Sequence, residues 1–223
     1  MTFSILAVDG TGAIGSAICS SSPAVAARCV TLEDGVGGAH SQNITDPRLG
    51  PRLLRLVREG RGPRYAIKEL TDREPTAEYR QLLVIDARGR TAVHSGTRTL
   101  GVHGAARGPH SVAAGNMLRD ERIPQLMVDA FESATGELET RLLSALTAAV
   151  GAGGEAGPVR SAGVSVVRAA GWRVTDLRID WHDTPVEELG RLLDTVWLPQ
   201  RDDYVTRGID PSRAPAYGVP GGE

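Results

Sequence analysis

The order of strand-like and helix-like patterns is the feature that most restricts the fold of this chain. Alternating apolar residues occupy 3–8 and 14–19, on either side of the turn Asp9-Gly10-Thr11-Gly12, which predicts a hairpin. Further strands are expected at 26–32, 36–42, 80–86, 91–95, 111–115, 162–167 and 173–179, and helices at 47–60, 63–70, 123–134, 137–150 and 185–196. We therefore predict an α+β fold, a four-layer αββα sandwich of two mainly antiparallel sheets.

The remaining segments predict loops, and the length predicts one large domain with a small appendage. Residues 151–158 are Gly-rich, and Pro and Gly recur from Pro199 onward, which favours irregular structure in both places. A chain of 223 residues exceeds the usual size of a single domain only modestly. We divide it into a domain at 1–180 and a short helical extension at 181–223.

Charge and composition exclude several classes of protein. The formal net charge is −2, which gives no electrostatic reason to expect a nucleic acid or an anionic membrane as partner. No apolar run is long enough to span a membrane, and the first residues lack the basic and apolar regions of a signal peptide. We expect a cytoplasmic protein. The cysteines, Cys19 and Cys29, are too few for a disulfide framework or a metal site.

Thr2 is the residue whose chemistry is best suited to catalysis. If Met1 is removed, Thr2 carries both a hydroxyl nucleophile and a free α-amine. The amine has an ordinary pKa of about 7.7–8.0, so it is partly a competent base at neutral pH. Threonine activated by its own amine is a recognised covalent catalyst.

Two more familiar site types are not supported by the spacing. Gly10-Thr11-Gly12-Ala13-Ile14-Gly15 resembles a dinucleotide fingerprint, but that motif must lead into a helix, whereas the continuation here alternates like a strand. The histidines show no metal-ligand pairing. We therefore expect neither a cofactor nor a metal.

Other candidates stand near the ends of expected strands. His40 lies in a strand that should run close to the first one, and Ser20 follows the second strand, where it could contact Thr2. Asn116 ends a strand, where its amide could donate to an oxyanion or simply form a turn. The segment 86–90 predicts only a turn.

Several short blocks resemble, in order and spacing, those of a known bacterial family. These blocks are Thr2-Phe3-Ser4-Ile5, Gly35-Val36-Gly37 with Gln42, Asp46-Pro47 with Gly50-Pro51, Glu78-Tyr79-Arg80-Gln81, Val84-Ile85-Asp86 with Gly89-Arg90, Ser95-Gly96 and Gly115-Asn116-Met117-Leu118. Over roughly residues 2–180 the chain resembles the domain-of-unknown-function family numbered 1028, which is grouped with the Ntn (N-terminal nucleophile) hydrolases. The segment after Asp180 looks like the short C-terminal module of some members, which has been likened to peptidoglycan-binding domains.

The resemblance implies an αββα sandwich with Thr2 at the mouth between the two sheets. In proteasome-like Ntn hydrolases, an aspartate after the second strand and a lysine on the third strand support the nucleophile. This chain has Ser20 at the first of these positions and no lysine on the expected third strand, and its only lysine, Lys68, falls in an expected helix. The resemblance therefore implies an altered relay.

Our functional hypothesis is a small-molecule amidohydrolase that forms an acyl-enzyme on Thr2. Ser20 and His40 would position the amine or move a proton, while Asn116 and backbone N–H groups near Gln42 and Asn43 would stabilise the oxyanion. Gln42, Asn43 and Arg80 are the candidate substrate-binding residues, with Arg80 holding a carboxylate.

Two alternatives remain open. One is an enzyme of the same fold that uses His40 for isomerisation or cyclisation. The other is a binding or assembly protein without catalysis. In each case we expect a homodimer.

Overall fold

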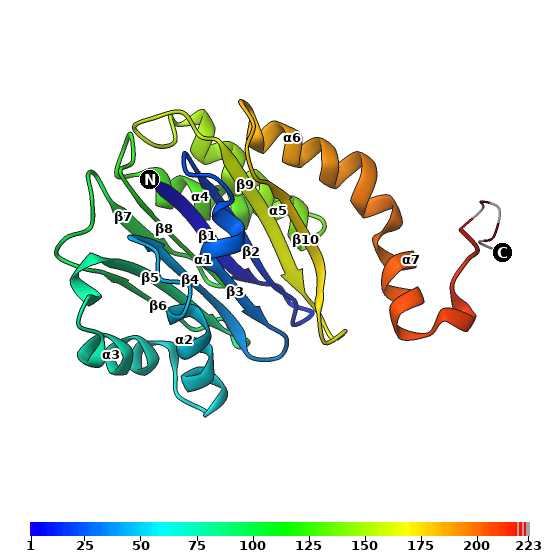
Figure 1. Cartoon of the computed structure of the whole chain (residues 1–223), viewed down its shortest axis with the longest axis horizontal. Coiled ribbons are helices and arrows are strands. Elements are labelled where there is room, and N and C mark those ends of the chain that lie inside the picture. Colours follow the sequence, from blue (N-terminus) through cyan, green and yellow to red (C-terminus); the bar gives the residue numbers. More distant parts are fainter. Residues whose placement is uncertain (218, 220, 222–223) are drawn as a thin grey trace.

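The computed structural model describes residues 1–217, 219 and 221. Its described part contains two antiparallel sheets that pack face to face between helices (Figure 1). The larger sheet has the order β10 (Arg173–Ile179), β9 (Ser161–Val167), β2 (Ile14–Ser20), β1 (Thr2–Val8), β8 (Ser111–Asn116) and β7 (Gly104–Arg107). The smaller sheet has the order β3 (Val30–Glu33), β4 (Gly37–Asn43), β5 (Arg80–Asp86) and β6 (Thr91–Ser95).

Helices cover the outer face of each sheet. The helices α4 (Ile123–Ser133) and α5 (Leu138–Gly151) pack on the larger sheet, and α2 (Leu49–Arg58) and α3 (Pro63–Arg73) pack on the smaller one (Figure 1). Short helical segments are α1 (Val25–Cys29), η1 (Ala77–Tyr79) and η3 (Pro211–Arg213). The predicted αββα sandwich is confirmed.

The core has three apolar layers. One lies between α4, α5 and the larger sheet around Phe3 and Phe131, and a second lies between α2, α3 and the smaller sheet around Leu53 and Leu82. The third lies between the sheets and includes Leu6 of β1. Because strand side chains alternate between faces, β1 serves two of these layers at once.

The Gly-rich segment after β1 is a hairpin turn. Gly12 has a φ of 91°, and β2 begins at Ile14 as a strand rather than a helix. At Gly15 an added Cβ would lie 2.5 Å from Cδ1 of Leu142, so the absence of a side chain lets α5 pack closely on β2. The rejection of a dinucleotide fingerprint is confirmed.

Three local predictions were wrong. Residues 25–29 form α1 rather than the start of a strand, because Val25, Ala26 and Cys29 lie on one helical face that packs on the larger sheet. The strand β7 was not expected because its sequence, Gly-Ala-Ala-Arg, lacks an apolar alternation. The start of the expected helix at Pro47 was also early, since Pro47 and Arg48 form a turn before α2.

The segment that begins at Pro199 is largely helical, where an irregular tail was expected after the helix at 185–196. After α6 (Pro185–Leu192) and a π-helical turn at Leu193–Trp197, α7 runs over Leu198–Ile209. Pro199 stands in the first turn of α7. Proline is tolerated there because its missing N–H and its fixed φ are compatible with the start of a helix, so the helix is not broken. Both helices run past the β10 edge of the larger sheet (Figure 1).

A buried ion-pair cluster attaches α7 to the larger domain. The Arg201 guanidinium is 2.9 Å from Glu137 and 3.2 Å from Glu139, and its side chain is only 8% exposed. Glu139 also accepts hydrogen bonds from Arg168 and from the Thr175 hydroxyl. The helix α7 therefore packs on the fold through specific contacts.

Within the residues described, no helix combines the length and the apolar character needed to cross a bilayer.

We expect Arg201→Ala to lower the free energy of unfolding by about 3 kcal/mol, because the buried Glu139 carboxylate loses one of its two arginine partners and keeps only Arg168. Limited proteolysis should then cut α7 sooner than in the wild type. Arg191→Ala, which removes an exposed partner of Glu188, is the control and should change neither measurement. Equal behaviour of the two variants would contradict the assigned role of the cluster.

Candidate functional site

Thr2 begins β1, the strand with β2 on one side and β8 on the other. The register places Thr2 directly opposite Asn116, and its hydroxyl lies 3.4 Å from the Ser20 hydroxyl at the end of β2. The Met1 carbonyl accepts hydrogen bonds from both hydroxyls. Antiparallel pairing thus brings together Thr2, Ser20 and Asn116, residues far apart in the sequence.

Polar side chains fill one end of the interface between the sheets. We call this set the polar seam: Thr2, Ser4, Ser16, Ser20, His40, Gln42, Gln81 and Asn116. Every member is buried, with Thr2 the most exposed at 5%. The other end of the same interface is apolar. The interface between the sheets therefore changes from polar to apolar along the strands, and the N-terminus lies at its polar end.

Hydrogen bonds connect most of the polar seam into one network. The Ser4 hydroxyl donates to Gln42, whose amide donates to Oε1 of Gln81 at 2.8 Å. The Asn116 amide donates to the same Gln81 oxygen at 3.1 Å, while Asn116 Oδ1 has no partner among the described residues. A primary amide has two N–H donors, so Asn116 keeps one donor beyond its bond to Gln81.

His40 lies at the centre of this network rather than at Thr2. Its ring nitrogens lie 2.9 Å from the Ser4 hydroxyl and 2.7 Å from the Ser16 hydroxyl. Complete burial, together with the nearby charge of Arg173, lowers the pKa of His40 from 6.5 to about 3. The imidazole is therefore neutral at physiological pH, and its hydrogen bonds to Ser4 and Ser16 do not connect it to Thr2 within the described residues.

Two of the expected substrate-binding residues face away from the polar seam. Asn43 and Arg80 are adjacent in sequence to Gln42 and Gln81, so alternation turns them to the other face of the smaller sheet. Asn43 donates to the Tyr79 carbonyl and accepts from the Leu100 N–H. Arg80 donates to the Ile44 carbonyl and to the Thr76 hydroxyl. The structure does not bring either residue to Thr2.

Glu155 is the site residue that sequence reasoning missed. It lies in the Gly-rich segment after α5, pairs with Leu118 and has a fully buried side chain. Its Oε2 is 4.0 Å from the N-terminal nitrogen of Met1, and neither oxygen makes a hydrogen bond within the described part of the chain. Burial raises the pKa of Glu155 from 4.5 to about 7, against the lowering effects of the N-terminal charge and of the nearby N–H and hydroxyl of Ser21.

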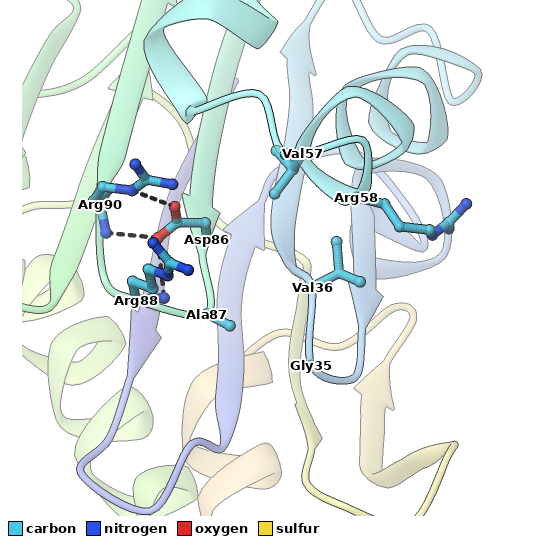
Figure 2. Close-up of a pocket in the computed structure, with 9 residues that line it drawn as sticks. Gly35, Val36, Val57, Arg58, Asp86, Ala87, Arg88 and Arg90 are labelled. Carbon is cyan, nitrogen blue, oxygen red and sulfur yellow. Dashed lines mark hydrogen bonds and ion pairs between the residues drawn. The ribbon is translucent and has the colours of Figure 1, made fainter.

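The surface pocket shown in Figure 2 lies away from this site. It has a volume of about 370 Å³ and is lined by residues that include Val36, Arg58 and Asp86. Asp86 is at the opposite end of β5 from Gln81, and its carboxylate accepts from the backbone of Arg88 and Arg90 to close the β5–β6 turn (Figure 2). The turn expected at 86–90 is confirmed.

No cluster of three or more His, Cys, Asp or Glu side chains suited to a metal occurs in the described residues. Cys19 and Cys29 are buried and free.

Comparison with known proteins identifies the family. The model of a family of unknown function, DUF1028, matches residues 2–189. The crystal structure of protein SPO2555 from Silicibacter pomeroyi, which carries the same family model, has a TM-score of 0.85 and 32% identity, over 92% of this chain and 94% of that one. The chain belongs to the DUF1028 family. No curated protein matches it.

Membership in DUF1028 confirms the resemblance inferred from short blocks of sequence. The match ends at residue 189, within α6. The remaining part of the chain, which includes α7, lies beyond the matched residues. The family has no known function, so the chemistry of its site rests on the geometry of this chain.

Glu155 carried no signal that could have distinguished it in sequence. It stands in Gly-Gly-Glu-Ala-Gly, where an acidic residue between glycines is typical of a solvated loop. Only the packing of that segment against Leu118 and the start of β1 makes the carboxylate a buried group.

We expect Glu155→Gln to raise the free energy of unfolding by about 2 kcal/mol at pH 8. The wild-type carboxyl has a raised folded pKa, so its stabilising contribution is complete below about pH 4.5 and is lost as the pH rises through about 7. The advantage of the variant should therefore vanish at pH 4.5. Denaturant unfolding at both pH values measures this.

Glu139→Gln is the matched control for that experiment. Glu139 is equally buried, but it is paired with Arg168, Arg201 and Thr175. Its replacement should destabilise the fold by about 3 kcal/mol. Destabilisation by both variants at pH 8 would show that Glu155 is also compensated.

We expect acid to destabilise the protein through His40. Its folded pKa of about 3 lies below the ordinary 6.5, so its contribution is complete above pH 6.5 and falls by about 1.4 kcal/mol per pH unit as the pH decreases towards 3. His40→Gln, which keeps hydrogen-bonding capacity without a titrating ring, should flatten the decrease in unfolding free energy between pH 6 and pH 4. Parallel curves would contradict this assignment.

Proposed function

We propose that this protein is a hydrolase of small amide or peptide-like substrates that forms an acyl-enzyme on Thr2 after removal of Met1. The supporting observation is the contact of the Thr2 hydroxyl with a carbonyl group and with the Ser20 hydroxyl at the polar end of the sheet interface. Met1 covers Thr2 in this structure. Its removal would free the α-amine and uncover the hydroxyl in a single step.

The chemistry follows from the properties of an N-terminal threonine. The neutral amine accepts the hydroxyl proton, and Oγ1 of Thr2 attacks the substrate carbonyl carbon. The C–N bond then breaks, and the leaving amine departs with the proton that the Thr2 amine carried. Water hydrolyses the resulting ester and regenerates Thr2.

Residues around Thr2 would supply the supporting roles. The Ser20 hydroxyl is in contact with the nucleophile, and the free N–H of Asn116, opposite Thr2, is available to an oxyanion. Removal of one such donor costs on the order of 3 kcal/mol in the best-studied serine hydrolase. Gln42 and His40 would hold the network in place, since neither contacts Thr2 among the described residues.

The relay differs from the one that the Ntn resemblance implies. The only lysine, Lys68, is on the outer helix α3 and pairs with Asp72. No cation therefore takes the place of the strand lysine among the polar seam residues, and we assign activation of the hydroxyl to the Thr2 amine alone.

A small-molecule substrate, a homodimer and a cytoplasmic location stay predictions. The isomerase or cyclase alternative has no specific support, because His40 is neutral and enclosed by Ser4 and Ser16. A binding protein without catalysis is the remaining outcome that the test below would reveal.

Thr2→Ala should reduce hydrolysis of anilide substrates to the background rate and abolish labelling by a β-lactone probe, with no change in unfolding. Alanine is also small enough for methionine removal, so intact mass should show loss of one methionine in both proteins. Thr2→Ser should retain labelling, and Thr11→Ala, in the exposed turn, is the control. Labelling that survives in Thr2→Ala would refute the proposal.

A further inference from the structure

The start of β1 is bordered by a buried carboxylate whose nearest cation among the described residues is the N-terminal ammonium of Met1, 4.0 Å away. The Glu155 side chain is fully buried, and its oxygens lack hydrogen bonds within the described residues. A buried carboxylate in this state reduces stability, whereas Glu139 on α5 is held by Arg168 and Arg201. A group that weakens the fold but lies next to Met1, the residue that precedes Thr2, is a candidate for binding a ligand.

Met1 indicates what kind of ligand fits beside Glu155. Its amine nitrogen is 4.0 Å from Glu155 Oε2. Its terminal methyl group packs at Gly157, where an added Cβ would lie 3.2 Å from Met1 Cε. Its carbonyl accepts from the hydroxyls of Thr2 and Ser20. An aminoacyl group is therefore contacted at its ammonium, its side chain and its carbonyl.

An acyl group on Thr2 Oγ1 would meet the same surroundings. The backbone nitrogen and Oγ1 of Thr2 are separated only by Cα and Cβ, so Met1 on the nitrogen and a substrate acyl group on the oxygen extend from nearly the same place. The acyl part of a substrate would thus extend into the space that Met1 occupies before its removal.

We propose that the substrates are amides of α-amino acids with a free α-ammonium group, and that Glu155 binds this ammonium. The proposal rests on the proposed acylation of Thr2 and names its substrate class. The scissile bond is the C–N bond of the aminoacyl amide, and the products are the free amino acid and the leaving amine. Glu155 is a binding residue and takes no proton in the reaction.

The charge state of the buried carboxyl agrees with this role. Burial raises the pKa of Glu155, and the N-terminal ammonium lowers it. A bound substrate ammonium would have the same lowering effect, so after removal of Met1 the carboxylate would regain a compensating charge when the substrate binds. Charge-assisted hydrogen bonds of this type are stronger than neutral ones.

The test compares three para-nitroanilides with the same leaving group: methionine anilide, N-acetylmethionine anilide and the analogue that lacks the amine, 4-(methylthio)butanoyl anilide. We expect Glu155→Gln to lower kcat/KM for methionine anilide about 10- to 100-fold, mainly through KM. It should leave the amine-free analogue unchanged. Glu187→Gln, an exposed carboxylate on α6, is the matched control and should behave like the wild type.

Two outcomes of this test overturn the inference while leaving Thr2 catalysis intact. One is a wild-type enzyme that hydrolyses all three anilides equally well. The other is an equal loss for methionine anilide and the amine-free analogue in Glu155→Gln, which would show that Glu155 acts on the Thr2 amine rather than on the substrate.

A binding measurement separates this inference from the proposed hydrolysis. Methioninamide should raise the Tm of the Thr2→Ala protein, N-acetylmethioninamide should not, and the added Glu155→Gln substitution should abolish the shift. If no anilide is hydrolysed but methioninamide binds through Glu155, catalysis is refuted and the ligand class stands. Absence of both refutes the inference as well.

Discussion

Antiparallel pairing on both sides of β1 is the constraint on which the rest of the site depends. Hydrogen bonds to β2 and β8 fix the register of all seven residues of this strand. A shift by one residue would exchange its two faces, placing Phe3 in the sheet interface and Thr2 among the helices. The apolar side chains of β1 thus hold its hydroxyls in place, and the position of Thr2 is a consequence of core packing.

The interface between the sheets has an apolar end that stabilises the fold and a polar end that contains the candidate site. Leu6, Leu83 and Val112 form an apolar contact at one end, while serine, histidine and amide side chains meet at the other. Buried polar groups cost free energy unless they are hydrogen-bonded, and the links through Ser4, His40 and Gln42 largely meet this requirement. The network keeps a polar surface rigid next to the N-terminus.

Two buried glutamates have opposite effects on the stability of the fold. Glu139 joins Arg168 and Arg201 and attaches the C-terminal helix to the larger sheet. Glu155 has no arginine partner among the described residues, and its nearest cation is the N-terminal ammonium of Met1 at 4.0 Å. The first stabilises the fold, whereas the second lowers its stability at neutral pH and leaves a negative charge for another group to compensate. Together they contrast a structural carboxylate with one that we propose to bind a ligand.

Periodicity by itself determined the α+β class, most strands and helices, and the hairpin at 9–12. Alternation and turn formation depend on residues that are adjacent in the sequence, so they can be recognised without the structure. Side-chain chemistry and the family resemblance suggested Thr2, Ser20, His40, Gln42 and Asn116 as candidate site residues, and all five lie in the polar seam. The tertiary structure alone decided that α7 is a helix packed through Arg201, that Asn43 and Arg80 face away from the site, and that Glu155 is buried. The reason is physical: burial and pairing of a charge depend on segments distant in sequence, and no local pattern records them.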